Sequence, residues 1–72
     1  MSKSVYVEAR PKGRDGDPIT HWVVEDQADS VPQKTHTQKE GIDWAKRQGY
    51  VPHVARSRHL DDKRRPDYWR AV

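Results

Sequence analysis

The residues with the clearest chemistry lie near the end of this 72-residue sequence, where cations and two aromatic side chains come close together. Cations neutralise phosphates, and a neighbouring aromatic ring stacks on a base, which is how single-stranded nucleic acids are held. Two interpretations stay open: a nucleic-acid-binding segment, or a solvated basic tail whose aromatic residues fill the core. In the first, phosphate contacts and stacking would come from Arg56, Arg58, Lys63, Arg64, Arg65, Tyr68 and Trp69, and His59 lies within the same cluster.

The charge of the chain is unevenly distributed. The formal net charge is +3, yet residues 1–55 carry eight Lys or Arg and eight Asp or Glu, whereas residues 56–72 carry six and three. The whole excess of positive charge therefore lies in the last quarter of the sequence. Such an imbalance indicates an anionic partner, and on this small scale it also serves solubility alone.

Nothing in the sequence predicts a metal site, a cofactor or a catalytic centre. The four histidines stand singly, at His21, His36, His53 and His59, without an H-x-x-x-H or H-E-x-x-H spacing, and there is no Cys. No Ser lies in a nucleophile elbow, and there is no phosphate-binding loop of the G-x-x-x-x-G-K-S/T type. We therefore expect no metal, no cofactor and no enzymatic activity.

The sequence contains no segment typical of a signal peptide or a membrane span. Its charged N-terminus is followed by Val5-Tyr6-Val7-Glu8 and by no long apolar run. Because there is no Cys, no disulfide can form and nothing indicates an oxidising compartment. We therefore expect a cytoplasmic protein without a membrane partner.

The segment from Thr37 to Gln48 is predicted to be the only regular helix. Thr37 and Glu40 have the spacing of a capping box, and Gly49 suits a left-handed helix stop. A helix of this length is not stable alone in water, so its apolar face must pack on neighbouring strands. With a turn of roughly 100° per residue, that face contains Ile42, Trp44 and Ala45.

Four segments have the alternation or the composition of β-strands: residues 4–10, 19–26, 31–36 and 52–58. In the first two, Val5 and Val7 share one side of their strand, as do Trp22 and Val24 of theirs. Pro32 cannot donate to a ladder, which places the third segment at an edge of the sheet. The expected core therefore consists of Val5, Val7, Trp22, Val24, Ile42, Trp44 and Ala45.

The register of the fourth strand is ambiguous, because a slip of one residue exchanges its two faces. We expect His53, Ala55 and Ser57 to face the core, since this leaves Arg56 and Arg58 in water. At the end of the chain, the run from Pro66 to Arg70 fits either one helical turn or a short extended piece. Two aromatic residues so near a terminus indicate that residues 59–72 dock on the domain.

Together these elements predict a single α+β domain over residues 1–72. We expect an antiparallel sheet of three to four strands in the order β-β-β-α-β, packed on one helix, with a basic C-terminal tail. The other face of the sheet would carry Tyr6, Arg10, His21 and Lys34 together with Glu8 and Glu25. Mixed charges of this kind are typical of a solvated face, so we expect that face to be wet.

Two motifs follow one another along the chain: W-x-V at Trp22 and Val24, then T-x-x-E-x-I-x-x-A at Thr37, Glu40, Ile42 and Ala45. In this order, over about residues 4–60, they resemble a family of small bacterial proteins classed as a domain of unknown function (family 2188 of that series). The resemblance implies a fold and assigns no catalytic residues. More coarsely, three strands followed by a helix is similar to the arm-binding domains of phage integrases, which read DNA with the sheet.

Two hypotheses about function follow. The first is a small bacterial or phage-type accessory protein that binds nucleic acid through the basic C-terminal segment. The second is a protein-interaction or homo-oligomerisation module that uses an edge strand or the open sheet face. The burial of Trp69 separates them in part, since a buried Trp69 makes the tail structural, whereas an exposed one favours binding.

Overall fold

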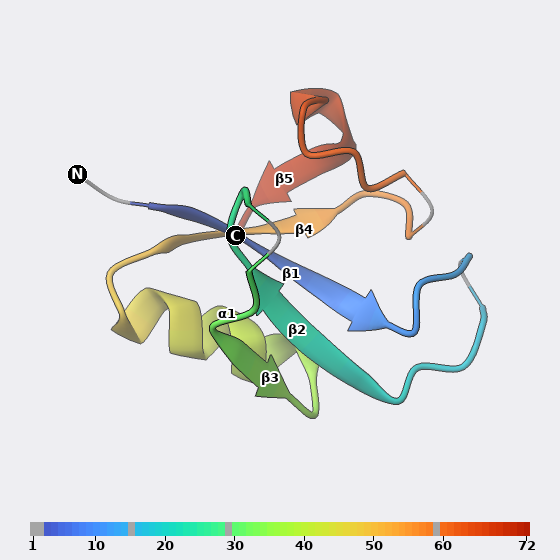
Figure 1. Cartoon of the computed structure of the whole chain (residues 1–72), viewed down its shortest axis with the longest axis horizontal. Coiled ribbons are helices and arrows are strands. Elements are labelled where there is room, and N and C mark those ends of the chain that lie inside the picture. Colours follow the sequence, from blue (N-terminus) through green and yellow to red (C-terminus); the bar gives the residue numbers. More distant parts are fainter. Residues whose placement is uncertain (1–2, 15, 29, 59) are drawn as a thin grey trace.

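The computed structural model of the protein describes residues 3–14, 16–28, 30–58 and 60–72, and it is a small α+β domain. A five-stranded sheet in the order β3-β2-β1-β4-β5 packs on one α-helix (Figure 1). Its elements in chain order are β1 (Ser4–Arg10), β2 (His21–Glu25), β3 (Gln33–Thr35), α1 (Gln38–Arg47), β4 (Val51–Ala55), the 3₁₀ turn η1 (Pro66–Tyr68) and β5 (Trp69–Ala71).

The sheet is mixed, so the prediction of an antiparallel sheet with three to four strands is wrong. The order β-β-β-α-β is present, but β1 and β4 run parallel, and the C-terminal tail adds a fifth strand, antiparallel to β4. The reason lies in the crossover. Two antiparallel pairings make β3 parallel to β1, and a helical connection then brings β4 back in the same direction beside β1.

The helix prediction is confirmed, including both of its ends. The Thr37 hydroxyl accepts a hydrogen bond from the Glu40 N–H at 3.1 Å and lies 3.2 Å from the Glu40 carboxylate, to which it donates. At the other end, Gly49 adopts a φ of +81°, which only glycine tolerates easily, and the Tyr50 N–H closes the turn on the Ala45 carbonyl at 2.9 Å. The cap and the glycine therefore set the length of α1. No helix in the described part of the chain is long and apolar enough to cross a membrane.

The hydrophobic core lies between α1 and the sheet. Its fully buried members come from three strands and the helix, and the residues packed around them are aromatic or branched. All seven residues expected in the core lie in it or against it. The cluster consists of Val5, Val7, Val24, Ala45 and Val54, with Trp22, Ile42, Trp44 and Tyr50 partly buried at its border.

The register expected for the fourth strand is wrong. Pro52 and Val54 are the buried residues of β4, and they lie beside Val5 and Val7 of β1 on the helix side. His53 and Ala55 face the opposite side. The expectation assumed that inward-facing Val54 would carry two arginines into the core, but β4 ends at Ala55, before either of them.

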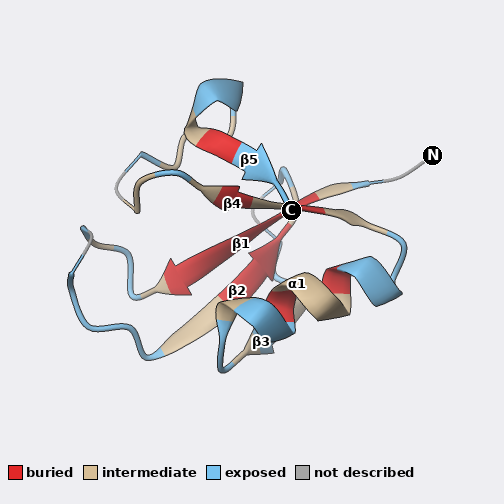
Figure 2. Ribbon diagram, turned by 180° about the vertical axis from the view of Figure 1, so that it is seen from behind, coloured by how far each residue is buried: buried red, intermediate tan, exposed pale blue. Residues whose placement is uncertain are grey.

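The second face of the sheet is covered, not wet as expected. Tyr6, Glu8, Val23 and Glu25 are all buried there, although α1 lies on the other side of the sheet (Figure 2). Residues 60–72, which we call the C-terminal cover, supply the packing. The Trp69 ring meets the Tyr6 ring edge-on, with 4.7 Å between the ring centroids. The sheet is therefore buried on both faces along β1, which explains the near-continuous burial from Val5 to Ala9.

Close packing of α1 on the sheet leads to a prediction for Gly41, which faces the core. A Cβ atom at this position would lie 2.9 Å from Val7 Cγ1 and 3.3 Å from Thr35 Oγ1. Gly41→Ala in a helix normally gains about 1 kcal/mol, but here the clash should outweigh this gain and lower the free energy of unfolding by about 1–2 kcal/mol. Urea denaturation measures the difference.

The control is Lys46→Gly at an exposed position of the same helix, which should cost about 1 kcal/mol through propensity alone. If Gly41→Ala stabilises the protein instead, the helix does not approach the sheet as closely as described here.

Candidate functional site

The five cations predicted to contact phosphate do not form one surface. Arg56, Arg64 and Arg65 are exposed, whereas Arg58 and Lys63 are half-buried and bound to the protein itself. His59 lies outside the described residues. The sequence placed these residues together because they are close along the chain, but the fold assigns them to different tasks.

Arg58 fixes the loop that joins β1 and β2. Its guanidinium donates to the carbonyl oxygen of Asp17 at 2.6 Å and to that of Arg14 at 3.2 Å, and it also reaches the carbonyls of Pro11 and Pro18. Charged donors make strong hydrogen bonds to carbonyl groups. Arg58 therefore holds both ends of the loop and is committed to that role in this structure.

Lys63 points inward, under the C-terminal cover. Its ammonium donates to the carbonyl of Asp26 at 2.9 Å, lies 3.9 Å from a carboxylate oxygen of Glu25, and stands 5.3 Å above the centre of the Tyr6 ring. Its side chain is 13% exposed. Lys63 is therefore largely buried and bound to internal acceptors, so it does not belong to an exposed phosphate-binding surface.

Trp69 is buried and Tyr68 is only partly exposed. The Trp69 indole N–H donates to the Asp62 carbonyl at 3.2 Å, and the ring packs on Tyr6. The burial of Trp69 makes the C-terminal segment structural. It corrects the expectation that Trp69 offers a stacking surface, because its ring already lies in the interior. Of the two predicted aromatic residues, only Tyr68 remains available to a ligand.

A smaller basic surface remains at the β4–β5 edge. The Arg56 N–H donates to the Tyr68 carbonyl at 2.8 Å, and the Tyr68 N–H donates to the Arg65 carbonyl at 3.0 Å, so these residues are neighbours. Arg70, opposite Val54, is exposed two residues beyond Tyr68. We call this group, Arg56, Arg65, Tyr68 and Arg70, the basic edge.

Arg70 was not among the predicted site residues, although it counted toward the basic excess. The signal was present in the run Tyr68-Trp69-Arg70. In an extended segment, neighbouring side chains point to opposite sides, so a buried Trp69 places Arg70 outward. The sequence left open whether residues 66–70 form one helical turn or an extended piece, and only the extended form places Arg70 outward. The chain in fact forms both, a 3₁₀ turn followed directly by a strand.

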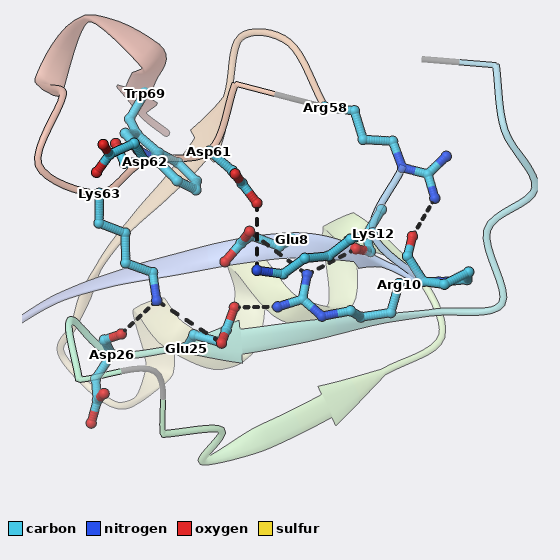
Figure 3. A network of polar contacts seen from close by, with 12 residues as sticks. Glu8, Arg10, Lys12, Glu25, Asp26, Arg58, Asp61, Asp62, Lys63 and Trp69 are labelled. Carbon is cyan, nitrogen blue, oxygen red and sulfur yellow. Dashed lines mark hydrogen bonds and ion pairs between the residues drawn. The ribbon is translucent and has the colours of Figure 1, made fainter. Parts of the chain in front are cut away.

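A second group of charges is buried between the sheet and the C-terminal cover. Figure 3 shows Glu8, Arg10, Glu25 and Lys63 pointing toward one another. The Arg10 guanidinium donates to the Glu25 carboxylate and lies 3.6 Å from that of Glu8. Glu8 and Glu25 are 7% and 5% exposed. We call these four residues the buried charge cluster.

The two carboxyl groups of this cluster share the available positive charge unequally. Burial raises the pKa of Glu8 to about 8, and the hydrogen bond and the negative charge of Glu25 add to this effect. For Glu25, burial acts in the same upward direction, but the hydrogen bond from Glu8 and the charges of Arg10 and Lys63 bring its pKa below the ordinary value. Near neutral pH the pair therefore holds one proton, on Glu8.

The charged residues of this cluster are visible in the sequence, but the sequence does not predict that they are buried. Glu8, Arg10 and Glu25 alternate with core residues, a pattern that predicts an ordinary solvated face. Lys63 lies 38 positions after Glu25 in the sequence, so no local pattern could join them.

Among the described residues, no group of three or more His, Cys, Asp or Glu side chains is arranged to hold a metal ion. In comparisons with known proteins, no family model, no curated protein and no solved structure matches this chain. The resemblance to the domain-of-unknown-function family stays a prediction.

The raised pKa of Glu8 predicts how stability depends on pH. Between about pH 4.5, the ordinary value, and about pH 8, the folded protein binds more protons at this site than the unfolded chain. The free energy of unfolding should therefore fall as pH rises through this window, by at most about 1.4 kcal/mol per pH unit. Urea denaturation at about pH 5.5 and about pH 8.5 measures this fall.

Glu8→Gln keeps the shape of the protonated carboxyl group and should remove most of the fall. The matched control is Glu40→Gln, which changes an exposed carboxylate and retains a residue suited to the capping box. The interpretation fails if Glu8→Gln and the unmodified protein lose the same stability between the two pH values.

Proposed function

We propose that this protein is a non-catalytic accessory protein that binds single-stranded nucleic acid through the basic edge. The observation that supports this most directly is the exposure of Arg56, Arg65 and Arg70 around one partly exposed tyrosine. In the described part of the chain, none of these arginines forms an ion pair. Exposed guanidinium groups bind phosphate well, and a tyrosine ring near them can stack on a base.

The acidic residues of the same region support the proposal because most of them are occupied elsewhere. Glu8 and Glu25 lie beneath the C-terminal cover, Asp62 binds the Arg64 guanidinium at 3.2 Å, and Asp61 lies 3.7 Å from the Lys12 ammonium. Asp67 remains exposed on η1. The charge of Arg65 also acts on Asp62, so three cations face Asp67 and part of the charge of Asp62, which still leaves a net attraction for a polyanion.

The alternative, a module that pairs through its sheet, has less support in this structure. The face expected to be open is covered, and the edge strands β3 and β5 contain three residues each. Pro32 stands directly before β3. Short edge strands and proline are features that prevent a sheet from pairing with another chain.

Salt dependence tests the nucleic-acid proposal. We expect a fluorescein-labelled oligothymidylate to bind in an anisotropy assay, with affinity falling steeply between about 20 and about 200 mM NaCl. Replacing Arg56, Arg65 and Arg70 together by Gln should reduce the slope of log K against log salt by about 2, since each phosphate contact contributes about 0.7.

The matched control replaces three exposed cations on α1, Lys39, Lys46 and Arg47, by Gln and should leave the slope nearly unchanged. Tyr68→Leu should weaken binding roughly tenfold, whereas Tyr68→Phe, which keeps the ring, should not. Absence of binding to single-stranded DNA, RNA and duplex DNA at the lowest salt would reject the proposal.

A further inference from the structure

A small cavity lies where β1 and β4 separate. β1 continues to Arg10, but its parallel pairing with β4 ends at the pair Val7 and Val54. Beyond that pair the two strands no longer pair, and the remaining walls come from the β1–β2 loop, the segment after β4, Trp22 of β2 and Gln38 at the start of α1. The space between them is a cavity of about 170 Å³.

The cavity lies in a favourable place for a ligand. In sheets with parallel strands, ligands commonly bind beyond the carboxyl ends of those strands, where the connections diverge. Here β1 and β4 both end at the cavity. Arg58, which ties down the β1–β2 loop, is also one of its lining residues, so that wall is held in place without a ligand.

The size of the cavity limits the ligand. A volume of about 170 Å³ is close to that of an apolar cavity of about 150 Å³ that binds benzene in another protein, so it suits one small ring with one substituent. Part of the lining is apolar and comes from β1, β2, β4 and the β1–β2 loop. It consists of Val7, Ala9, Ile19, Trp22 and Ala55, and Ile19 is 46% exposed.

The charged part of the lining is positive overall. Three cations, Arg10, Lys12 and Arg58, face two acids, Glu8 and Asp61. These groups sum to +1, and to +2 when Glu8 carries its proton, as burial and Glu25 favour near neutral pH. Neutral or cationic ligands would leave this charge unbalanced, whereas a monoanion reduces it.

We propose that this cavity binds a small organic anion, a carboxylate attached to a single flat apolar ring. The ring lies against Trp22 and Ile19, and the carboxylate faces Lys12. The Lys12 ammonium lies 3.7 Å from the Asp61 carboxylate, and the Lys12 side chain is 69% exposed. An exposed ion pair of this kind is weak, so Lys12 can turn from Asp61 to a ligand. Arg10 and Arg58 keep their internal partners and contribute through their charge.

This site is separate from the basic edge. None of Arg56, Arg65, Tyr68 and Arg70 lines the cavity. Loss of one binding activity therefore leaves the other intact, and the two proposals can fail independently.

A titration with benzoate, followed by ¹H–¹⁵N NMR on the full chain, tests the proposal. The protein has three tryptophans, and each indole N–H gives its own signal. Trp22 lines the cavity, whereas Trp44 and Trp69 do not, so they serve as internal references. We expect the Trp22 signal to shift with a Kd on the order of 1 mM, typical of a ligand of this size, while the other two stay nearly fixed.

Two analogues separate charge from shape. Benzamide keeps the ring and lacks the charge, and acetate keeps the charge and lacks the ring. Each should bind at least about fivefold more weakly than benzoate. Equal binding of benzamide would overturn the assignment to an anion, and equal binding of acetate would overturn the role of the ring.

Lys12→Gln should weaken benzoate binding about fivefold without unfolding the protein, since the side chain is largely exposed. Lys46→Gln, at an exposed position eight residues along α1 from the lining residue Gln38, is the matched control and should change nothing. The proposal is overturned if benzoate leaves the Trp22 signal unmoved at tens of millimolar, or if both variants bind benzoate like the unmodified protein.

Discussion

Much of the structure depends on the packing of the C-terminal cover against Tyr6. Trp69 meets the ring from the edge, and the Lys63 ammonium lies over it, so one side chain of β1 holds both an aromatic residue and a cation of the cover. This contact closes the second face of the sheet. Because burial disfavours charge there, the two carboxyl groups hold one proton near neutral pH, on Glu8, and the charge of Glu25 is balanced by Arg10 and Lys63. The burial of charge is thus a consequence of the packing.

The local features of the fold could be predicted from the sequence, and the non-local ones could not. Thr37, Glu40 and Gly49 define α1 through contacts between residues a few positions apart, and the core residues follow from strand alternation. The parallel pairing of β1 with β4 joins residues more than forty positions apart, and no turn between them specifies direction. The prediction for the register of β4 is wrong for a related reason, because it depends on two arginines that lie beyond the end of the strand.

The candidate site was predicted in outline because charge is visible in a sequence, but the role of each cation is not. Arg58 and Arg56 are separated by a single residue, yet one binds loop carbonyls and the other is exposed. Lys63 and Arg64 are adjacent and differ in the same way. What decides the outcome is whether the fold offers an internal acceptor within reach, and these acceptors come from the β1–β2 loop and from β2. Counting charges therefore overestimates the binding surface.

The buried acids alter this count in the opposite direction. A formal charge of +3 treats Glu8 as ionised, but a protonated Glu8 makes the net charge +4, and Glu25 is neutralised locally by Arg10. The fold makes two cations, Arg58 and Lys63, unavailable to a ligand, and it also removes two acids, Glu8 and Glu25, from the surface. The remaining exposed arginines at the β4–β5 edge thus face fewer opposing charges than the sequence suggests. A fold that buries acids beneath its own C-terminal segment can present a basic surface although its net charge is small.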